Sequence, residues 1–199
     1  MYMYRIRLNP KKRKTAIALE NPNLFHGYFK AHFEEVPLFR VDKVGSNYHM
    51  LVLADVPNID FDEFISQFGY AKDSAEYKDY SKVLNAIEKD KRYRFRLYAS
   101  PTFGIDGKKF SCTTYDRLAP WLARKAQDCG FKTTESAVLM TKKEQGFRHG
   151  KDFMTIKSVI FEGILTVEDK DKFKHALITG IGSRKSYGMG MLTVAPIID

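Results

Sequence analysis

The first residues of the chain alternate between apolar and polar positions. Within residues 1–8 every second side chain is apolar, and arginines stand between them: the apolar set is Tyr2, Tyr4, Ile6 and Leu8. A period of two places one set on each face of an extended chain. The pattern therefore predicts a strand with one buried face.

A helical period follows a basic loop at residues 11–14. Asn21 is a residue type that caps helices, and Pro22 suits the first helical position. From there, apolar and aromatic side chains recur every three or four residues, which gathers them on one helical face. That face comprises Leu24, Phe25, Tyr28, Phe29, His32 and Phe33. We therefore expect a helix that packs on a core, with His32 in the middle of its buried face.

The rest of the first half completes a β-α-β-β-α-β order. Strands are predicted at residues 38–43 and 48–55, a helix at 59–67, and a further strand at 92–99 after the polar stretch 72–91. That order is typical of the ferredoxin-like unit.

The second half has the same character. The predicted elements are strands at 108–113, 136–141, 155–167 and 191–197, and helices at 115–130 and 168–179, which end at Gly130 and Gly180. We expect an α+β chain of two tandem ferredoxin-like, RNA-recognition-motif-like domains, each with an antiparallel sheet and helices on one face. The domains would span residues 1–102 and 103–199.

Composition narrows the class of partner. Lys and Arg number 33 and Asp and Glu 24, a net charge of +9, which favours an anionic partner such as nucleic acid. Apolar residues, at 44%, exclude wholesale disorder. No apolar run is as long as a membrane span and no signal-peptide core is visible, so we expect a cytoplasmic protein without a membrane partner. Cys112 and Cys129 lack the spacing of a zinc ribbon or disulfide framework, and we expect two reduced thiols.

Arginines line one side of the strand predicted at 92–99. Arg92, Arg94 and Arg96 alternate with apolar residues. First and fourth strands are neighbours in a ferredoxin-like sheet, so Arg5 is expected beside them. Phosphates would relieve the repulsion between these like charges. A solvated outer face with flexible arginines is the alternative.

Two further segments have the composition of nucleic-acid contacts. The segment KKEQGFRHGK, residues 142–151, has two turn-permitting glycines, Gly146 and Gly150, and basic residues that include Lys143, Arg148 and Lys151. We interpret it as a protruding basic hairpin that binds nucleic acid, with an ordinary charged loop as the alternative.

The segment GIGSRKSYGMGM, residues 180–191, is rich in glycine. It follows a helix and enters a strand, unlike a dinucleotide fingerprint, and it lacks the GK[ST] ending of a Walker A motif. Its backbone N–H groups are suited to a phosphate, with Arg184 and Lys185 supplying charge. The alternative is a structural crossover that needs positive φ angles, which we expect at Gly182 and Gly188.

His26 is the histidine best placed for chemistry. It lies at the polar edge of the first predicted helix, near the N-terminal end, where the helix dipole favours the uncharged imidazole. That state suits proton transfer at neutral pH. The remaining histidines show no metal-ligand spacing, so no metal site is expected.

Four stretches together resemble CasE, the repeat-processing endoribonuclease of the type I-E (Cascade) CRISPR system. NPNLFHGYF (21–29) resembles the family's NP-x-x-x-H segment, and FRLYASPT (95–102) its FRLRANPT strand. FEGILTV (161–167) and GIGSRKSYGMGML (180–192) resemble its FEG-[IV]-LT-[IV] strand and its G-I-G-x-x-K-S-x-G-x-G-L-L loop.

The resemblance implies an activity and partners. Such enzymes cleave precursor CRISPR RNA at the base of a repeat stem-loop without a metal or other cofactor. The 2′-hydroxyl attacks the adjacent phosphate and leaves a 2′,3′-cyclic phosphate and a 5′-hydroxyl. CRISPR repeat RNA and the other Cascade subunits are the implied partners. A non-cleaving subunit that only binds the RNA hairpin is the alternative, and a generic nucleic-acid-binding ferredoxin-like protein is a third.

Residue by residue, His26 falls on the family's catalytic histidine, and Lys185 on the basic position of the loop that contacts RNA phosphate. Residues 142–151 occupy the place of the basic hairpin that enters the groove of the stem. The RNA-contacting set we expect is Arg5, Arg94, Arg96, Lys143, Arg148, Lys151, Gly182, Arg184, Lys185 and Ser186.

The chain departs from the family pattern at three positions. Asn23 stands where some members have a tyrosine, which leaves the second catalytic group open; Tyr28 and Lys30 are the alternatives nearby. Tyr98 and Ser100 replace an arginine and an asparagine, so RNA contacts there are expected to differ.

Overall fold

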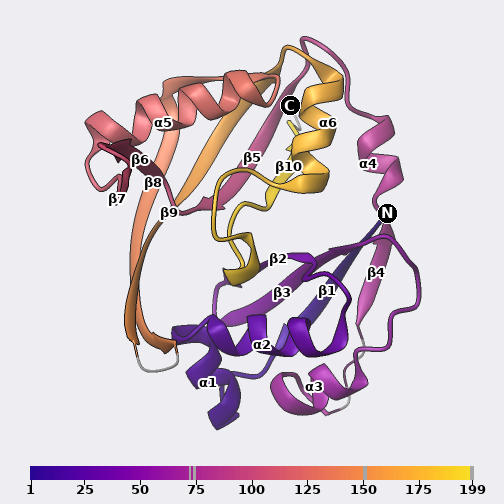
Figure 1. Ribbon diagram of the computed structural model, residues 1–199. Coiled ribbons are helices and arrows are strands. Elements are labelled where there is room, and N and C mark those ends of the chain that lie inside the picture. Colours follow the sequence, from indigo (N-terminus) through magenta and orange to yellow (C-terminus); the bar gives the residue numbers. More distant parts are fainter. Residues whose placement is uncertain (72, 74, 150–151, 198–199) are drawn as a thin grey trace. The chain divides into compact units, whose positions relative to one another are not determined.

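The computed structural model describes residues 1–71, 73, 75–149 and 152–197 (Figure 1). The chain divides into two compact units. The first comprises Met1–Val83 with Gln145–Met154 and Ser186–Gly188, and the second comprises the remainder. Each unit contains a four-stranded sheet with helices, so the prediction of two ferredoxin-like domains is confirmed.

The sheet of the first unit has the strand order β2-β3-β1-β4, and its neighbouring strands pair antiparallel. Its strands are β1 (Tyr2–Leu8), β2 (Leu38–Val44), β3 (Asn47–Ala54) and β4 (Glu76–Asp79). The first strand lies between the third and the fourth, as the ferredoxin-like order requires. The alternation in β1 is realised, since Tyr4, Ile6 and Leu8 are buried and Arg5 and Arg7 are exposed.

Helices α1 (Arg13–Glu20), α2 (Asn23–His32) and α3 (Asp62–Phe68) cover one face of this sheet, and α4 (Ser81–Asn85) follows β4 (Figure 1). Aromatic rings from α2 and α3 form the core against the strands. Phe25 and Phe68 lie 5.1 Å apart between ring centroids, and Phe29 and Phe39 lie 4.8 Å apart. Burial of these large rings supplies the main apolar stabilisation of the unit.

The second unit repeats the arrangement with the order β10-β5-β9-β8. Its strands are β5 (Arg92–Ala99), β8 (Phe131–His149), β9 (Asp152–Val167) and β10 (Leu192–Pro196), and β5 pairs antiparallel with both β9 and β10. Helices α5 (Tyr115–Asp128) and α6 (Lys170–Thr179) supply Trp121 and Phe173 to the core, where Trp121 stacks on Phe161 at 5.7 Å. A short hairpin of β6 (Thr102–Ile105) and β7 (Lys108–Ser111) is inserted between β5 and α5.

The prediction that residues 92–99 close the first sheet is wrong. Strand β5 begins the second sheet, and β4, within the polar stretch, pairs with β1 instead, with Glu76 opposite Arg5. The division between the units accordingly falls after Val83 rather than near residue 102. All four residues of β4 are exposed, so this strand carries no apolar alternation that a sequence pattern reveals.

Two expectations for the first helical segment also need correction. An unforeseen helix, α1, begins within the basic loop and runs to Glu20. Helix α2 begins at Asn23, after Pro22, and the side chain of Asn21 accepts a hydrogen bond from the Asn23 N–H at 3.1 Å. His32 is exposed rather than packed in the core. Its ring stacks on Tyr28 at 4.0 Å, and its Nε2 lies 3.1 Å from a carboxylate oxygen of Glu63.

The basic segment extends two long strands. Strand β8 runs to His149 and β9 starts at Asp152, so Gly146 lies within a strand and not in a turn. A Cβ at Gly146 would lie 2.6 Å from the Phe153 ring, which occupies that space across the strand pair. Gly150 and Lys151 lie outside the described residues.

Both cysteines are free thiols, as expected, and burial raises the pKa of each. Among the helices of the described residues, none combines the length and apolar character needed to cross a membrane.

The glycine-rich loop has the expected left-handed backbone at Gly182 (φ 88°) and Gly188 (φ 80°). A Cβ at Gly188 would lie 2.9 Å from Cε2 of Phe39, whose side chain is 1% exposed and has no room to move.

We predict that Gly188→Ala destabilises the protein by about 1 kcal/mol or more, because it adds both backbone strain and a clash. Thermal unfolding measures the effect. Gly27→Ala is the matched control, since Gly27 lies in α2 with a negative φ and with open space around its Cβ position, and alanine should preserve or raise stability there. Equal melting temperatures for Gly188→Ala and the wild type would contradict the prediction.

Candidate functional site

His26 lies in the first half of α2 and is half-buried. Its ring contacts Tyr187, with centroids 5.2 Å apart and planes at 37°. Tyr187 ends a 3-10 turn, η1 (Lys185–Tyr187), in the glycine-rich loop. Residues Ser186–Gly188 cluster with the first unit, so this contact lies within one compact unit. The sequence showed Tyr187 inside the loop motif, but no local pattern linked it to His26.

The loop is held close to α2 by a second contact. Gly188 lies against the ring of Phe39, and Phe39 packs on Phe29, which follows His26 by three residues on the same helix. Residues three apart share a helical face. The segment Ser186–Gly188 therefore contacts the neighbourhood of His26 through both a ring and a glycine.

The alternatives to a tyrosine at position 23 have different surroundings. Tyr28 belongs to the aromatic core, is 8% exposed, and lies 5.0 Å from Phe64 between ring centroids. Burial raises its pKa, which makes it a poor proton donor or acceptor at neutral pH. Lys30 is exposed on α2. Among the described residues, Tyr187 is thus a tyrosine whose ring packs on His26.

The part of the loop before η1 belongs to the second unit and lies beside a cavity of about 310 Å³. Arg124 and Lys125 of α5 line it together with the hydroxyl-bearing Ser100, Thr102 and Ser183, and Gly182 lies at its wall. Arg184 has φ 61°, an uncommon conformation for a residue with a side chain. Cations, hydroxyls and a glycine backbone at one opening are suited to an anion such as phosphate.

Lys185 also belongs to the second unit. Its stem lies near Gly190, where a Cβ would come within 3.1 Å of the Lys185 Cγ. Ser186 follows it in η1 and is half-buried. Gly190 therefore leaves space for the lysine side chain along the loop.

The row of arginines expected along residues 92–99, with Arg5 beside it, is present only in part. Arg94 and Arg96 lie on the face of the second sheet opposite α5 and α6, where Arg94 is exposed and Arg96 Nε lies 3.4 Å from Glu162. Lys143 Nζ lies 5.6 Å from the ring of Tyr98 on the same strand face. Arg5, by contrast, belongs to the first sheet and forms an ion pair with Glu76 at 2.6 Å, so its expected place beside Arg94 and Arg96 is wrong.

Tyr98 in β5 and Ser100 just after it, the two positions at which the chain departs from the family strand motif, both form hydrogen bonds within the protein. Ser158 donates to the Tyr98 hydroxyl at 2.9 Å, and burial raises the Tyr98 pKa. Ser100 donates to the carbonyl of Lys157, also at 2.9 Å. Both residues thereby connect β5 and its extension to β9.

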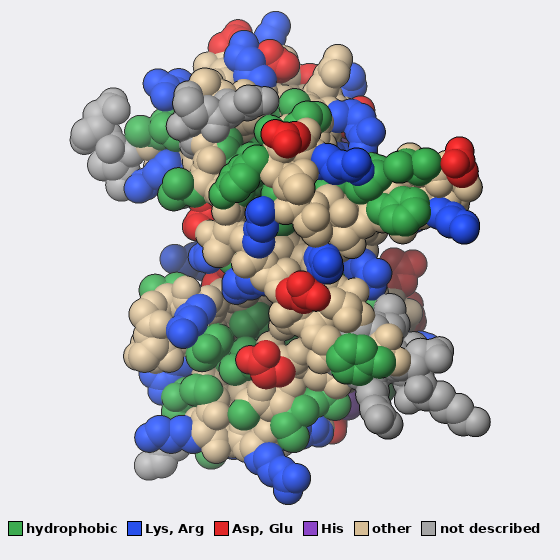
Figure 2. All heavy atoms as spheres, turned by 90° about the vertical axis from the view of Figure 1, so that its left-hand side faces the viewer, with side chains coloured by type: hydrophobic (Ala, Val, Ile, Leu, Met, Phe, Trp, Pro, Cys, Tyr) green, Lys and Arg blue, Asp and Glu red, His purple; other side chains and the backbone are tan. Residues whose placement is uncertain are grey.

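The basic segment has one described cation of the expected set, Lys143, which is exposed. Gln145 Nε2 donates to the Leu19 carbonyl of α1 at 3.0 Å, a contact within the first unit. Arg148 lies on β8, but its side chain, like Lys151, is outside the described residues. On the face drawn in Figure 2, Lys and Arg side chains are spread over the surface, with hydrophobic side chains exposed between them.

Comparison with known proteins matches nearly the whole chain to one family. The model of the family described as CRISPR associated protein matches residues 1–196. The CRISPR-associated endoribonuclease Cse3 of Thermus thermophilus is 30% identical over 125 residues, which cover 56% of this chain and 59% of that protein. The aligned part thus spans less than two thirds of the curated relative.

Solved structures with similar folds cover almost the entire chain. Thermus thermophilus Cse3 bound to an RNA representing a pre-cleavage complex has a TM-score of 0.76 at 24% identity, with 98% of both chains covered. Cas6e from Escherichia coli K-12 has a TM-score of 0.70 at 21% identity, covering 99% of this chain and 100% of that one. These likenesses establish the shared fold. With the family match over residues 1–196, they confirm the resemblance drawn from the motifs, and the chain belongs to the CRISPR-associated protein family that includes CasE.

Proposed function

We propose that this chain is a metal-independent endoribonuclease that binds the CRISPR repeat stem-loop and cleaves precursor CRISPR RNA. It retains the product as a subunit of a Cascade-type complex. The observation that carries the proposal is the ring contact of His26 with Tyr187 of the glycine-rich loop. The motif resemblance identifies His26 with the family's catalytic histidine, which supports the same assignment. The matched relative is named an endoribonuclease, which supports the same activity.

The proposed reaction is an internal transesterification. The 2′-oxygen of the scissile nucleotide loses its proton and attacks the adjacent phosphorus, while the bond from phosphorus to the 5′-oxygen breaks and that oxygen gains a proton. A 2′,3′-cyclic phosphate and a 5′-hydroxyl result. His26 serves as general acid or base for one of these protons, because an imidazole holds or releases a proton near neutral pH.

Negative charge that develops on the phosphate needs cations and N–H donors. We assign this role to Lys185 with the backbone of the glycine-rich loop at Gly182, Arg184 and Ser186. Arg94, Arg96 and Lys143 are assigned to phosphates of the stem, because they lie on one sheet face of the second unit. Arg148 and Lys151 remain expected contacts of the basic hairpin. Arg5 is a weaker candidate, since Glu76 already compensates its charge.

Tyr187 is proposed as a positioning residue for His26. A ring packed 5.2 Å from an imidazole restricts the orientations that the imidazole adopts. Small errors in the placement of a proton-transfer group are costly, since the rate depends on close alignment. This chain has Asn23 where some relatives have a tyrosine. We therefore assign the aromatic contact beside His26 to Tyr187 of the loop.

The first prediction for the proposed reaction concerns His26. His26→Ala should slow single-turnover cleavage of labelled repeat RNA by about 100-fold or more, the usual scale for loss of a general acid or base. RNA affinity and melting temperature should be retained. His32→Ala is the control, because this exposed histidine of the same helix contacts Glu63 and Tyr28 and should leave the cleavage rate unchanged.

A modified RNA substrate distinguishes an effect on the cleavage step from an effect on RNA binding. A single 2′-deoxy substitution at the scissile nucleotide should block cleavage while binding persists, and cleavage of the ribose substrate should proceed in excess EDTA. Full activity of His26→Ala, or cleavage of the deoxy substrate, would overturn the transesterification proposal. RNA binding without cleavage by the wild type would favour the non-cleaving subunit instead.

A second prediction concerns Tyr187. Tyr187→Leu should lower the single-turnover rate at saturating RNA by about 10-fold or more with little change in RNA affinity, because the imidazole loses its packing partner. Tyr187→Phe keeps the ring and should restore the rate. If phenylalanine were as slow as leucine, the hydroxyl and not the ring would be responsible, and the positioning role would be wrong.

A third prediction concerns the cations of the second sheet. The double variant Arg94→Ala with Lys143→Ala should weaken binding of the repeat hairpin and reduce the slope of log affinity against log salt by about two, because two RNA phosphates are no longer neutralised. Lys78→Ala with Lys82→Ala removes the same charge from exposed positions in the first unit. An equal change of slope in that control pair would show general attraction rather than a defined surface.

A further inference from the structure

The β6–β7 hairpin has no role in the proposed reaction. The second sheet already has its four strands without it, so the hairpin adds nothing to the ferredoxin-like order. Its base is closed by a hydrogen bond from the Cys112 N–H to the Pro101 carbonyl at 2.9 Å. The hairpin is therefore an ordered insertion on the second unit. Apart from Thr102, which lines the cavity beside Gly182, its side chains are available for a separate purpose.

Two aromatic rings form one face of this hairpin. The strand register places Phe103 opposite Phe110, and their rings stack with centroids 5.7 Å apart and planes at 30°. Phe110 is 45% exposed. Exposed aromatic surface that contributes little to a core commonly marks a contact with another molecule.

Cations accompany the aromatic rings in this part of the unit. The guanidinium carbon of Arg117, in the first turn of α5, lies 4.0 Å from the centroid of the Phe103 ring. Lys142 Nζ lies 4.9 Å from the ring of Tyr115, which is 59% exposed at the start of the same helix. Aromatic faces bordered by Arg and Lys are the means by which proteins stack unpaired bases while neutralising the backbone.

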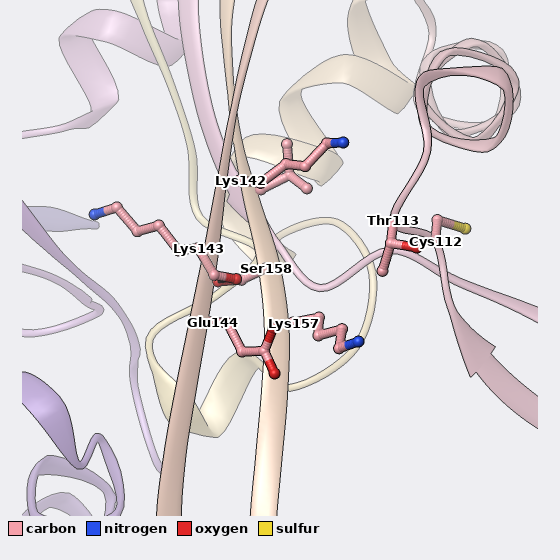
Figure 3. Close-up of a pocket in the computed structure, with 8 residues that line it drawn as sticks. Cys112, Thr113, Lys142, Lys143, Glu144, Lys157 and Ser158 are labelled. Carbon is pink, nitrogen blue, oxygen red and sulfur yellow. Dashed lines mark hydrogen bonds between the residues drawn. The ribbon is translucent and has the colours of Figure 1, made fainter.

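A cavity of about 250 Å³ opens where the chain leaves the hairpin. Figure 3 shows Lys142 and Lys157 extended toward the side on which Thr113 and Cys112 lie, whereas Lys143 extends the opposite way. Burial raises the pKa of the Cys112 thiol, so this side chain is uncharged and no nucleophile at neutral pH. The carboxylate of Glu144 also lines this cavity, on the side of Lys157. The two lysines still outnumber it, and together with the threonine hydroxyl they suit a phosphate group.

We propose that Phe103, Phe110 and Arg117, with Tyr115 and Lys142 beside them, form a stacking platform for unpaired RNA bases that flank the repeat stem. Lys142 and Lys157 bind the phosphates between those bases. The proposal rests on the proposed function in that the ligand is the same RNA. It adds a second contact area, which recognises single-stranded nucleotides rather than the stem. The combination of flat aromatic surface and positive charge favours RNA over a protein partner here.

The test compares the full-length wild type with Phe110→Ala on two RNAs, the repeat hairpin alone and the hairpin with unpaired nucleotides on both sides. The wild type should bind the flanked RNA more tightly. Phe110→Ala should lose at least about 5-fold in affinity for the flanked RNA and keep its affinity for the bare hairpin, consistent with the loss of one base stack. Phe110→Trp should restore binding, whereas Phe110→Leu, apolar without a π-face, should not.

A fluorescent base analogue, 2-aminopurine, reports stacking directly. Placed in turn at each flanking position, it should be quenched on binding to the wild type at one or two positions and remain bright with Phe110→Ala. Leu139→Ala is the matched control, because Leu139 is a strongly exposed apolar residue of the same unit outside the hairpin, and it should leave quenching unchanged. Melting temperatures verify that each variant is folded.

The outcomes separate the two proposals. A wild type that neither binds nor cleaves the bare repeat hairpin would overturn the proposed function. Normal hairpin binding and cleavage, with equal affinity of wild type and Phe110→Ala for the flanked RNA, would overturn the platform alone. Loss of association with other Cascade subunits in Phe110→Ala, at unchanged RNA affinity, would also overturn it and assign the hairpin to a protein contact.

Discussion

The contact between Gly188 and Phe39 is the constraint on which the candidate active site depends. Gly188 needs a left-handed backbone, and the buried Phe39 ring leaves no space for a Cβ there. Because glycine alone meets both demands at low cost, the chain returns to the first unit for three residues, Ser186–Gly188, and Tyr187 contacts His26. The glycine-rich loop, whose sequence predicts a phosphate-binding segment, thus also packs against the first unit beside His26.

The aromatic core of the first unit gives that contact a rigid base. Phe29 of α2 packs on Phe39 of β2, so the helix that carries His26 and the strand that receives Gly188 share one set of rings. Tyr28 lies in the same core, and desolvation raises the pKa of its phenol, which makes it unsuited to proton transfer at neutral pH. Rings packed at 5–6 Å resist displacement, because any shift opens a gap that costs dispersion energy. Such rigidity is what a group needs if its orientation is to control a rate.

The Arg and Lys side chains differ in whether a carboxylate forms an ion pair with them. On the first sheet, Arg5 and Arg7 form ion pairs with Glu76 and Asp73, which lowers the attraction of this surface for RNA. On the second unit, Arg94 lies exposed beside strands that carry few acidic residues, and the cation–aromatic pairs of Arg117 and Lys142 border the inserted hairpin. The net charge of +9 therefore describes an average. The places where RNA contacts are expected therefore depend on the surroundings of each cation and not on the net charge alone.

The sequence by itself determined the fold class, most of the helices and strands, the left-handed glycines and the candidacy of His26. Periodicity and motif spacing act over a few residues, and these features depend on such short ranges. Tertiary structure alone decided that the exposed β4, and not β5, pairs with β1, because its four residues carry no apolar signal. It also decided that Arg5 and Arg94 belong to different sheets and that His32 lies at the surface, since both depend on strand pairing and helix placement. The contact between His26 and Tyr187 joins residues 161 positions apart in the chain, and only the folded backbone brings such residues together.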